Sequence, residues 1–369
     1  MICTFRSFKL AWPVALVVLL AAGCANNSQS ATTSPASTLP ATTTSVSTSS
    51  PATAPATTAI LGTTAETVTD LDFLYQTRVG DGLGVFVSID GVVRRVDEAP
   101  GTRHKHPVWT NAGSHVGFVA EGEWDAAGAV VRQSEVWVVG PAGEDPAALI
   151  TCDCWDLNNP SWSPDGSKIA YVEFDAPAAN GPPTASRIVV LDVTSGERIV
   201  VVGSEPGQLV DIPRWSPDGV QLVVSIDRFD PSGSETGSSG WSRPAVARWS
   251  RSFHSGEFTY AADWNRMTGS LVVSVETQEF ASPDPRVSPW DLFEIQPDGT
   301  GRRAITDLGD EQGLSLPVWS SDGTLIAATL DTTLGEPGGQ MAVVVNLETG
   351  AITPLAEPIS DYARLRPTS

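Results

Sequence analysis

The sequence is poor in basic residues. Its 369 residues contain 22 lysines and arginines against 43 aspartates and glutamates, a formal net charge of −21, and only Lys9, Lys105 and Lys168 are lysines. A surface of this sign repels nucleic acids and anionic polymers, and it favours solubility and basic partners. We therefore expect no nucleic-acid partner.

Signatures of catalysis and of metal binding are also missing. No Gly-x-Ser-x-Gly nucleophile elbow occurs, so an α/β-hydrolase or prolyl-peptidase type of enzyme is excluded. The four cysteines and four histidines do not form a zinc signature. We expect no metal and no cofactor.

The only long apolar run lies at the start of the chain. Arg6 and Lys9 precede an apolar stretch, 10–22, that ends in small residues before Cys24. This order is typical of an export signal and is short for a transmembrane helix. The cysteine after small residues resembles the lipobox of bacterial lipoproteins, which implies cleavage after residue 23, lipidation of Cys24 and anchoring outside the bacterial plasma membrane. The alternatives are an uncleaved anchor and plain secretion.

Charge is absent from residues 25–65, which are almost entirely Ser, Thr, Ala and Pro. Such a composition offers too little apolar area to offset the entropy lost on folding. We interpret residues 24–65 as a disordered tether with a reach of about 35 Å. The folded part is then a single domain, residues 66–369.

A repeat organises that domain. The heptad Pro-Ser-Trp-Ser-Pro-Asp-Gly at 160–166 recurs at 213–219 and 317–323, and more loosely at 107–113 and 262–269. The tryptophans of the five copies lie 53, 53, 49 and 55 residues apart; they are Trp109, Trp162, Trp215, Trp264 and Trp319. This period matches one four-stranded propeller blade.

Each copy predicts a hairpin whose turn is Ser-Pro-Asp-Gly, and a second hairpin follows it. Proline presets φ, the aspartate can accept a bond from its own downstream amide, and glycine supplies a positive φ. We therefore interpret Asp165, Asp218 and Asp322 as turn residues and not as catalytic acids. The tryptophans are placed to fill the gaps between neighbouring blades.

The repeats predict an all-β fold, a six-bladed β-propeller of four-stranded antiparallel blades. Segments 73–79 and 83–96 supply three strands without a preceding Pro-x-Trp strand. The missing strand is predicted at the C-terminus, in 362–369, where it completes the blade begun near Leu71 and closes the ring. We expect a monomer.

With its Pro-x-Trp-Ser-Pro-Asp-Gly hairpins, the region from Leu71 to Ser369 resembles the TolB-like family of six-bladed propellers, also described as WD40-like or PD40 repeats. The resemblance implies the architecture. It does not imply one activity, since the fold hosts envelope scaffolds, binding proteins, sugar-chain lyases and peptidase lids.

The longer connections all fall on one face of the predicted propeller, which is usual for a binding face. They are 121–133, 175–186, 227–243, 276–289 and 331–340. Candidate binding residues on this face and at the channel mouth are His104, His106, Trp124, Trp155, Trp241, Trp290, Arg364 and Arg366. The histidines, two apart on a strand, are expected to point the same way and could bind a metal or a carboxylate, or form a hydrogen-bonded structural pair. The tryptophans are either interface anchors or plugs for their own loops.

Cys152 and Cys154 are two residues apart, close to the geometric limit for a bridge. A strained disulfide, two inert thiols, and a redox or metal role all remain open.

These features favour a lipid-anchored, non-enzymatic propeller that binds an envelope protein or glycan through its long-loop face. The alternative is a carbohydrate-binding or carbohydrate-active propeller, of the lyase or hydrolase type, with its site at the channel mouth.

Overall fold

The structure is a computed structural model. It describes residues 71–97, 99, 101, 103–124, 130–152, 154–176, 183–229, 235–244, 250–252, 259–276, 289–309, 312–332, 339–355 and 362–367. The chain divides into two units, Met1–Pro55 and Ala56–Ser369, and every described residue belongs to the second. The predicted signal peptide, Cys24 and the tether lie outside the described residues. No described helix has the length and hydropathy of a membrane span.

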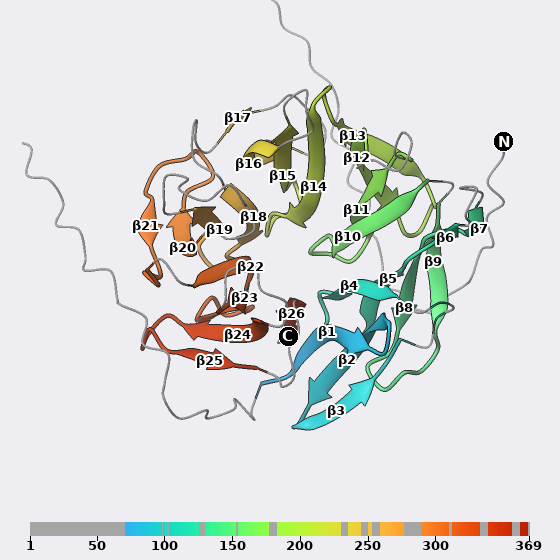
Figure 1. Ribbon diagram of the computed structural model, residues 1–369, viewed down its shortest axis with the longest axis horizontal. Helices are drawn as coiled ribbons and strands as arrows, with labels where there is room; N and C mark the ends of the chain where they lie inside the picture. Colours follow the sequence, from blue (N-terminus) through green and yellow to red (C-terminus); the bar gives the residue numbers. More distant parts are fainter. Residues whose placement is uncertain are drawn as a thin grey trace, which may run out of the picture. The chain divides into compact units, whose positions relative to one another are not determined.

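The described strands form six four-stranded antiparallel sheets and one two-stranded ribbon. Each sheet has an inner strand beside the centre of a ring and an outer strand at its rim (Figure 1). From inner to outer, the sheets are β26 (Tyr362–Leu365), β1 (Phe73–Val79), β2 (Gly82–Ile89), β3 (Val92–Arg95); β4 (His104–Trp109), β5 (Val116–Ala120), β8 (Glu135–Val139), β9 (Ala147–Thr151); β10 (Asp156–Trp162), β11 (Lys168–Phe174), β12 (Ser186–Asp192), β13 (Arg198–Gly203); β14 (Gln208–Trp215), β15 (Gln221–Phe229), β16 (Glu235–Pro244), β17 (Ser250–Ser252); β18 (Thr259–Trp264), β19 (Leu271–Glu276), β20 (Trp290–Ile295), β21 (Arg303–Ala304); and β22 (Gly313–Trp319), β23 (Leu325–Asp331), β24 (Gln340–Asn346), β25 (Ile352–Pro354). The ribbon pairs β6 (Glu123–Trp124) with β7 (Val130–Arg132). The fold prediction is confirmed: the sheets are the blades of an all-β propeller.

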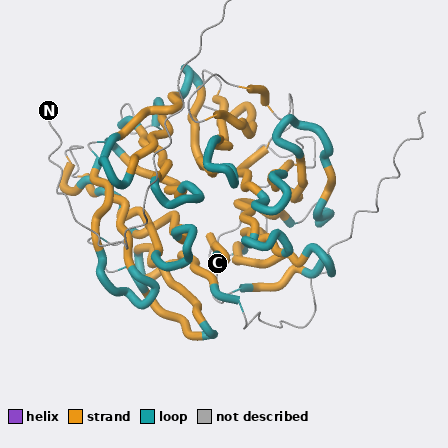
Figure 2. The backbone as a smooth tube through the Cα atoms, turned by 180° about the vertical axis from the view of Figure 1, so that it is seen from behind, coloured by secondary structure: helices purple, strands orange, loops and turns teal. Residues whose placement is uncertain are grey.

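The C-terminal strand closes the ring, as predicted. Strand β26 pairs antiparallel with β1 in a register that sets Leu365 opposite Phe73 and Tyr362 opposite Gln76. Strand β26 lies at the inner edge of the ring (Figure 1), and the described chain consists of strands and loops only (Figure 2). Phe73, Ala363 and Leu365 share an apolar cluster with residues of the neighbouring β22–β25 sheet. The last strand therefore joins the two ends of the propeller.

The repeated tryptophans pack between blades, as their spacing predicted. Trp215 of β14 belongs to an apolar cluster with Ala170, Val172 and Ile188 of the preceding sheet. Its Nε1 donates to the backbone oxygen of Ser161 at 3.1 Å, on the inner strand of that sheet. Trp264 makes the equivalent bond to the oxygen of Arg214, and Trp109 to that of Arg364. These three indoles thus both fill an inter-blade gap and satisfy a buried carbonyl, whereas Nε1 of Trp162 and of Trp319 has no partner among the described residues.

The inner strands carry a bulge that the sequence pattern did not reveal. The residue three before each tryptophan has a positive φ of 49° to 54°, and the strand register shifts at that point. These residues are His106, Asn159, Ile212, Ala261 and Leu316. A left-handed conformation is costly for a β-branched residue such as Ile212, so the surrounding blade must impose it.

The aspartates of the Ser-Pro-Asp-Gly turns have the structural role that was predicted. Asp165 accepts from Ser163 Oγ at 2.6 Å and from the Ser167 amide at 3.0 Å, and these bonds lower its pKa to about 2. Asp218 and Asp322 make the same kind of turn, with pKa values lowered first by hydrogen bonds from Ser216 and Ser320. The three carboxyl groups are held by their own turns.

Substituting Gly219 tests this turn chemistry. Its φ is +69°, and a Cβ there would also lie 3.4 Å from Pro164 Cδ. We expect Gly219→Ala to lower the free energy of unfolding by about 1–2 kcal/mol, because L side chains disfavour positive φ. Chemical denaturation measures the free energy of unfolding. Gly203→Ala is the control, because an added Cβ at Gly203 meets nothing within 4 Å. Equal effects at both positions would contradict the prediction.

Candidate ligand site in the central channel

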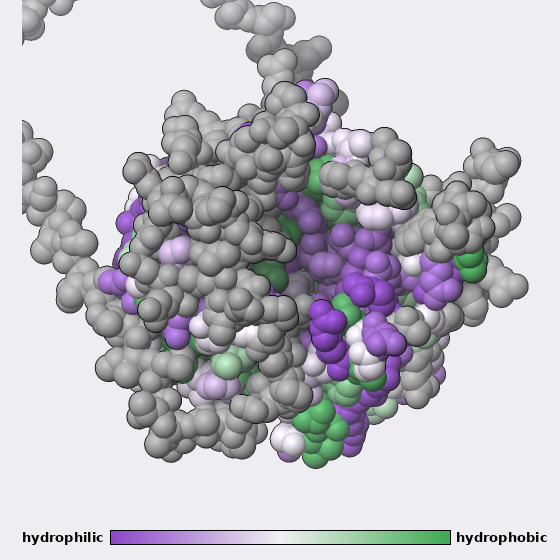
Figure 3. Space-filling model, viewed as in Figure 1, coloured by the Kyte–Doolittle hydropathy of each residue, from purple (hydrophilic) through white to green (hydrophobic). Residues whose placement is uncertain are grey.

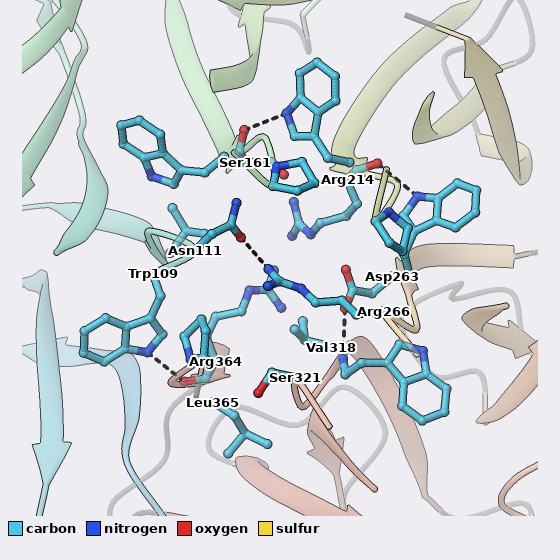
Figure 4. Close-up of a pocket in the computed structure, with 18 residues that line it drawn as sticks. Trp109, Asn111, Ser161, Arg214, Asp263, Arg266, Val318, Ser321, Arg364 and Leu365 are labelled. Carbon is cyan, nitrogen blue, oxygen red and sulfur yellow. Dashed lines mark hydrogen bonds between the residues drawn. The ribbon is translucent and has the colours of Figure 1, made fainter. Parts of the chain in front are cut away.

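A pocket opens in the central channel, close to the Ser-Pro-Asp-Gly turns (Figure 4). Every blade contributes three of its 18 lining residues: the one before the repeated tryptophan, the tryptophan or its counterpart Leu365, and the one two positions later. They are Val108, Trp109, Asn111; Ser161, Trp162, Pro164; Arg214, Trp215, Pro217; Asp263, Trp264, Arg266; Val318, Trp319, Ser321; and Arg364, Leu365, Pro367. The open space is about 760 Å³, including the part open to solvent.

Three arginines from different blades point into this pocket (Figure 4). Arg214 of β14 and Arg364 of β26 are buried, at 7% and 4% exposure, whereas Arg266 follows β18 and is exposed. Tyr362 links the buried pair: its Oη lies 2.5 Å from Arg364 Nη2 and 3.3 Å from Arg214 Nη2. Arg364 also stacks over the Tyr362 ring, 4.3 Å from its centroid. Tyr362 thus holds the two buried guanidinium groups in place by hydrogen bonds, and that of Arg364 also by stacking.

Burial shifts the pKa values of the arginine and the aspartate in the site, and in each case it disfavours the charged form. It lowers the pKa of Arg364 to about 10, with the Arg214 charge adding to the effect, so Arg364 stays cationic at neutral pH. Burial raises the pKa of Asp263, although the charges of Arg214 and Arg364 oppose the rise. Asp263 Oδ2 accepts from the Trp319 amide at 2.9 Å, so the next blade fixes this carboxyl group.

Arg266 crosses the mouth of the pocket. Its Nη2 donates to Oδ1 of Asn111, and Asn111 Nδ2 donates to the backbone oxygen of Ser163 (Figure 4). Arg266 belongs to the β18 sheet and Asn111 to the β4 sheet, which lie three blades apart in the ring. A single exposed side chain therefore spans the opening over the two buried arginines.

Comparisons with known proteins bear on the fold. No family model matches the chain. The Tol-Pal system protein TolB of Alcanivorax borkumensis is 36% identical over 72 residues, which is 20% of this chain and 15% of that protein. Three solved structures resemble most of the chain at 14% identity. TolB from Acinetobacter baumannii gives a TM-score of 0.56 over 81% of this chain and 67% of its own. A putative TolB from Agrobacterium tumefaciens gives 0.54 over 81% and 98%. An oligogalacturonate lyase in complex with manganese gives 0.50 over 77% and 73%. The fold is that of the TolB-like β-propellers.

The propeller separates the two histidines that were expected to act together. His104 is 1% exposed; its Nδ1 lies 2.5 Å from Asp97 Oδ2 and its ring packs edge-on against Phe118. His106 sits at the bulge, where the positive φ breaks the strand alternation, and its ring faces Tyr362 at 5.8 Å. The expectation that both side chains point the same way is therefore wrong. Burial, aided by the Lys105 charge, lowers the pKa of His106 well below its ordinary value, so His106 is neutral at pH 7.

The other predicted binding residues have four different placements. Trp155 packs against the cluster of the β10–β13 and β14–β17 sheets, and Trp290 is half-buried in β20. Trp124 and Trp241 lie in β6 and β16, but their side chains are outside the described set, as are large parts of the predicted long loops. Arg366 acts as a clamp, donating to Asp72 and to the Gly113 oxygen at 2.9 Å each. Of the binding residues predicted from the sequence, Arg364 is the one that lines the pocket.

Cys152 and Cys154 are joined by a disulfide, with Cα atoms 5.2 Å apart. Together with Glu173 they are the one described cluster that brings three metal-ligand residues within reach of each other. Glu173, however, already accepts hydrogen bonds from Arg187 and Arg198.

Hydrophilic residues gather on the surface around β4 and β10 (Figure 3). In these strands Lys105 pairs with Asp156 at 2.6 Å.

The Asp97–His104 contact gives a pH-dependent prediction. Burial alone would raise the pKa of Asp97, but hydrogen bonds from His104 and Arg95 outweigh it and lower that pKa. The stabilisation is then present above the unfolded pKa of about 3.9 and is lost as pH falls through the folded value. We expect Asp97→Asn to reduce the free energy of unfolding at pH 7 by about 1–3 kcal/mol, with a smaller difference below pH 4. Urea denaturation across pH 3–7 measures it.

Asp81→Asn, at an exposed turn, is the control and should change stability by less than about 0.5 kcal/mol. A wild-type advantage over Asp97→Asn that is undiminished in acid would contradict the assignment.

Proposed function

We propose that the chain is a lipid-anchored, extracytoplasmic binding protein, not an enzyme, and that its partner or ligand engages the central channel. The observation that carries the proposal is the pocket itself: six blades contribute equivalent positions to one polar opening that holds three arginines. The sequence supports the location, since a predicted export signal and Cys24 precede an uncharged segment that is predicted to be a tether. A relative that matches 72 residues of the chain is named as a Tol-Pal system protein, and two TolB proteins of other organisms resemble the fold.

The chemistry of the pocket favours binding over catalysis. Arginine stays protonated across the physiological range and offers fixed donors, so it positions an anion but does not act as a general base. The acid in the pocket, Asp263, accepts from a backbone amide and is held by it. Tyr362 serves the buried arginines in the same structural way. The described residues of the pocket can therefore bind and orient an anion, and none of them has the role of a general base.

The proposal moves the binding site from the long-loop face to the opposite end of the channel. The long loops fall largely outside the described residues, so that prediction stays open. The turn-side pocket is the site with described geometry, and we assign the partner to it.

Photo-cross-linking in cells tests the assignment. A benzophenone amino acid at Pro217, on the rim of the pocket, should capture a partner from the envelope. The same group at Val200, exposed on the outer strand β13, is the matched control and should capture none. Equal labelling from both sites would contradict the proposal, as would turnover of oligogalacturonate that is lost on Arg364→Met.

The anchor has its own test. We expect Cys24→Ser to move the protein from the membrane fraction to the soluble extracytoplasmic fraction, because the acyl chains are lost. Immunoblotting after fractionation measures the shift. A variant that stays in the membrane fraction would show that Cys24 is not the anchor.

A further inference from the structure

Among the described residues, three that line the channel have a buried donor without a hydrogen-bond partner: Arg364 at Nη1, and Trp162 and Trp319 at Nε1. The charged one is Arg364 Nη1, which makes no hydrogen bond to a described residue, although Nη2 is bonded to Tyr362. Arg364 lines the pocket and its guanidinium points into it (Figure 4). An unsatisfied cationic donor at 4% exposure is costly unless something completes it.

Cations outnumber acids among the residues that line the pocket. Arg214, Arg266 and Arg364 stand against Asp263, and a second acid, Asp211, lies close enough for its charge to act on Arg214. None of the ion pairs between described residues includes Arg214 or Arg364. His106, whose ring faces Tyr362, is neutral at pH 7, because burial lowers its pKa well below the ordinary value. A singly charged anion with two acceptor oxygens would offset part of this positive excess and match the paired N–H donors of a guanidinium.

We propose that the arginine pair, Arg214 and Arg364, binds a single carboxylate group that enters between the turns under Arg266. The inference rests on the proposed binding function and names the chemistry that function recognises. A guanidinium donates two parallel N–H groups to a carboxylate, and Nη1 of Arg364 is placed to give one of them. The carboxylate comes from a free small acid or from the C-terminus of a partner chain.

The charge of the rest of the protein narrows the ligand further. With a net charge of −21, the surface repels a polyanion before it reaches the channel. A lone carboxylate on a neutral or basic molecule avoids that repulsion. This separates the ligand from nucleic acids and from long acidic glycans.

Calorimetric titration of the detergent-solubilised full chain tests the inference. The probes are N-acetylglycine for a chain-terminal carboxylate, acetate for a free acid, N-acetylglycinamide as the neutral analogue, and inorganic phosphate, all at matched ionic strength. We expect the carboxylates to bind more tightly than phosphate, and the amide not to bind. Tighter binding of N-acetylglycine than of acetate indicates a partner C-terminus, and the reverse a free acid.

Variants identify the residues. Arg364→Met and Arg214→Met should each weaken carboxylate binding at least about tenfold, while Arg303→Met, exposed in β21 and paired with Glu294, should leave it unchanged. Each variant is first checked for cooperative unfolding, and if one of them is not folded the other still tests the inference. No carboxylate binding, tighter phosphate binding, or unchanged affinity in both variants would overturn the inference. If Pro217 still cross-links a partner in that case, the binding function stands and only its carboxylate chemistry fails.

Discussion

Removal of residues 356–369 is expected to lower the melting temperature by about 10 °C or more, or to prevent folding. The deletion takes away β26, whose Tyr362, Ala363 and Leu365 are buried. Burying each large side chain contributes about 1.5–3 kcal/mol, so the loss is about 5 kcal/mol, a large part of the stability of an ordinary domain. It also exposes the edge of β1 to aggregation. Differential scanning calorimetry and size-exclusion chromatography measure both effects.

A stop after Pro367 is the matched control. It removes only Thr368 and Ser369 and leaves β26 and the Arg366 clamp intact, so it should melt as the full chain does. If the longer deletion also melted as the full chain does, β26 would not be part of the propeller.

Replacement of Trp215 by alanine is expected to cost about 3–5 kcal/mol of the free energy of unfolding, the usual range for a buried aromatic. Its indole is 7% exposed and packs in the cluster between two blades. The change also leaves the backbone oxygen of Ser161 without its donor. Urea denaturation measures the loss.

Two substitutions bracket this effect. Trp215→Phe keeps most of the packing but not the hydrogen bond, so it should cost clearly less than alanine. Met267→Ala, at a side chain 71% exposed, should be close to neutral. A Trp215→Ala variant as stable as Met267→Ala would refute the role of the repeated tryptophans between blades.

The architecture could be predicted from the sequence because its determinants are local and repeated. The Ser-Pro-Asp-Gly turns fix each hairpin through bonds within a few residues, as at Asp165. The tryptophan period sets the blade length, and the lack of a first Pro-x-Trp strand before Phe73 points to the C-terminal strand that pairs with it. These signals do not depend on knowing the rest of the structure.

The site was harder to predict because it depends on contacts between distant blades. The sequence drew attention to Arg364 but not to Arg214, Asp263 or Arg266, which meet it only when the ring closes. A usable signal was present: Arg214 and Asp263 each stand directly before a repeated tryptophan, and alternation along a strand turns that position away from the blade gap. The histidine prediction failed for a different reason. The bulge at His106 reverses the alternation on which it relied.

Hydrogen exchange at β26 tests the account most directly, because both the closed ring and the arginine pair require this strand in place. Its pairing with β1 predicts slow exchange for the amides of 362–365, comparable with the inner strands β10 and β14, and loss of that protection only with global unfolding. Fast exchange at 362–365 while β10 and β14 remain protected would show an open ring, and neither the propeller closure nor the channel site could then stand.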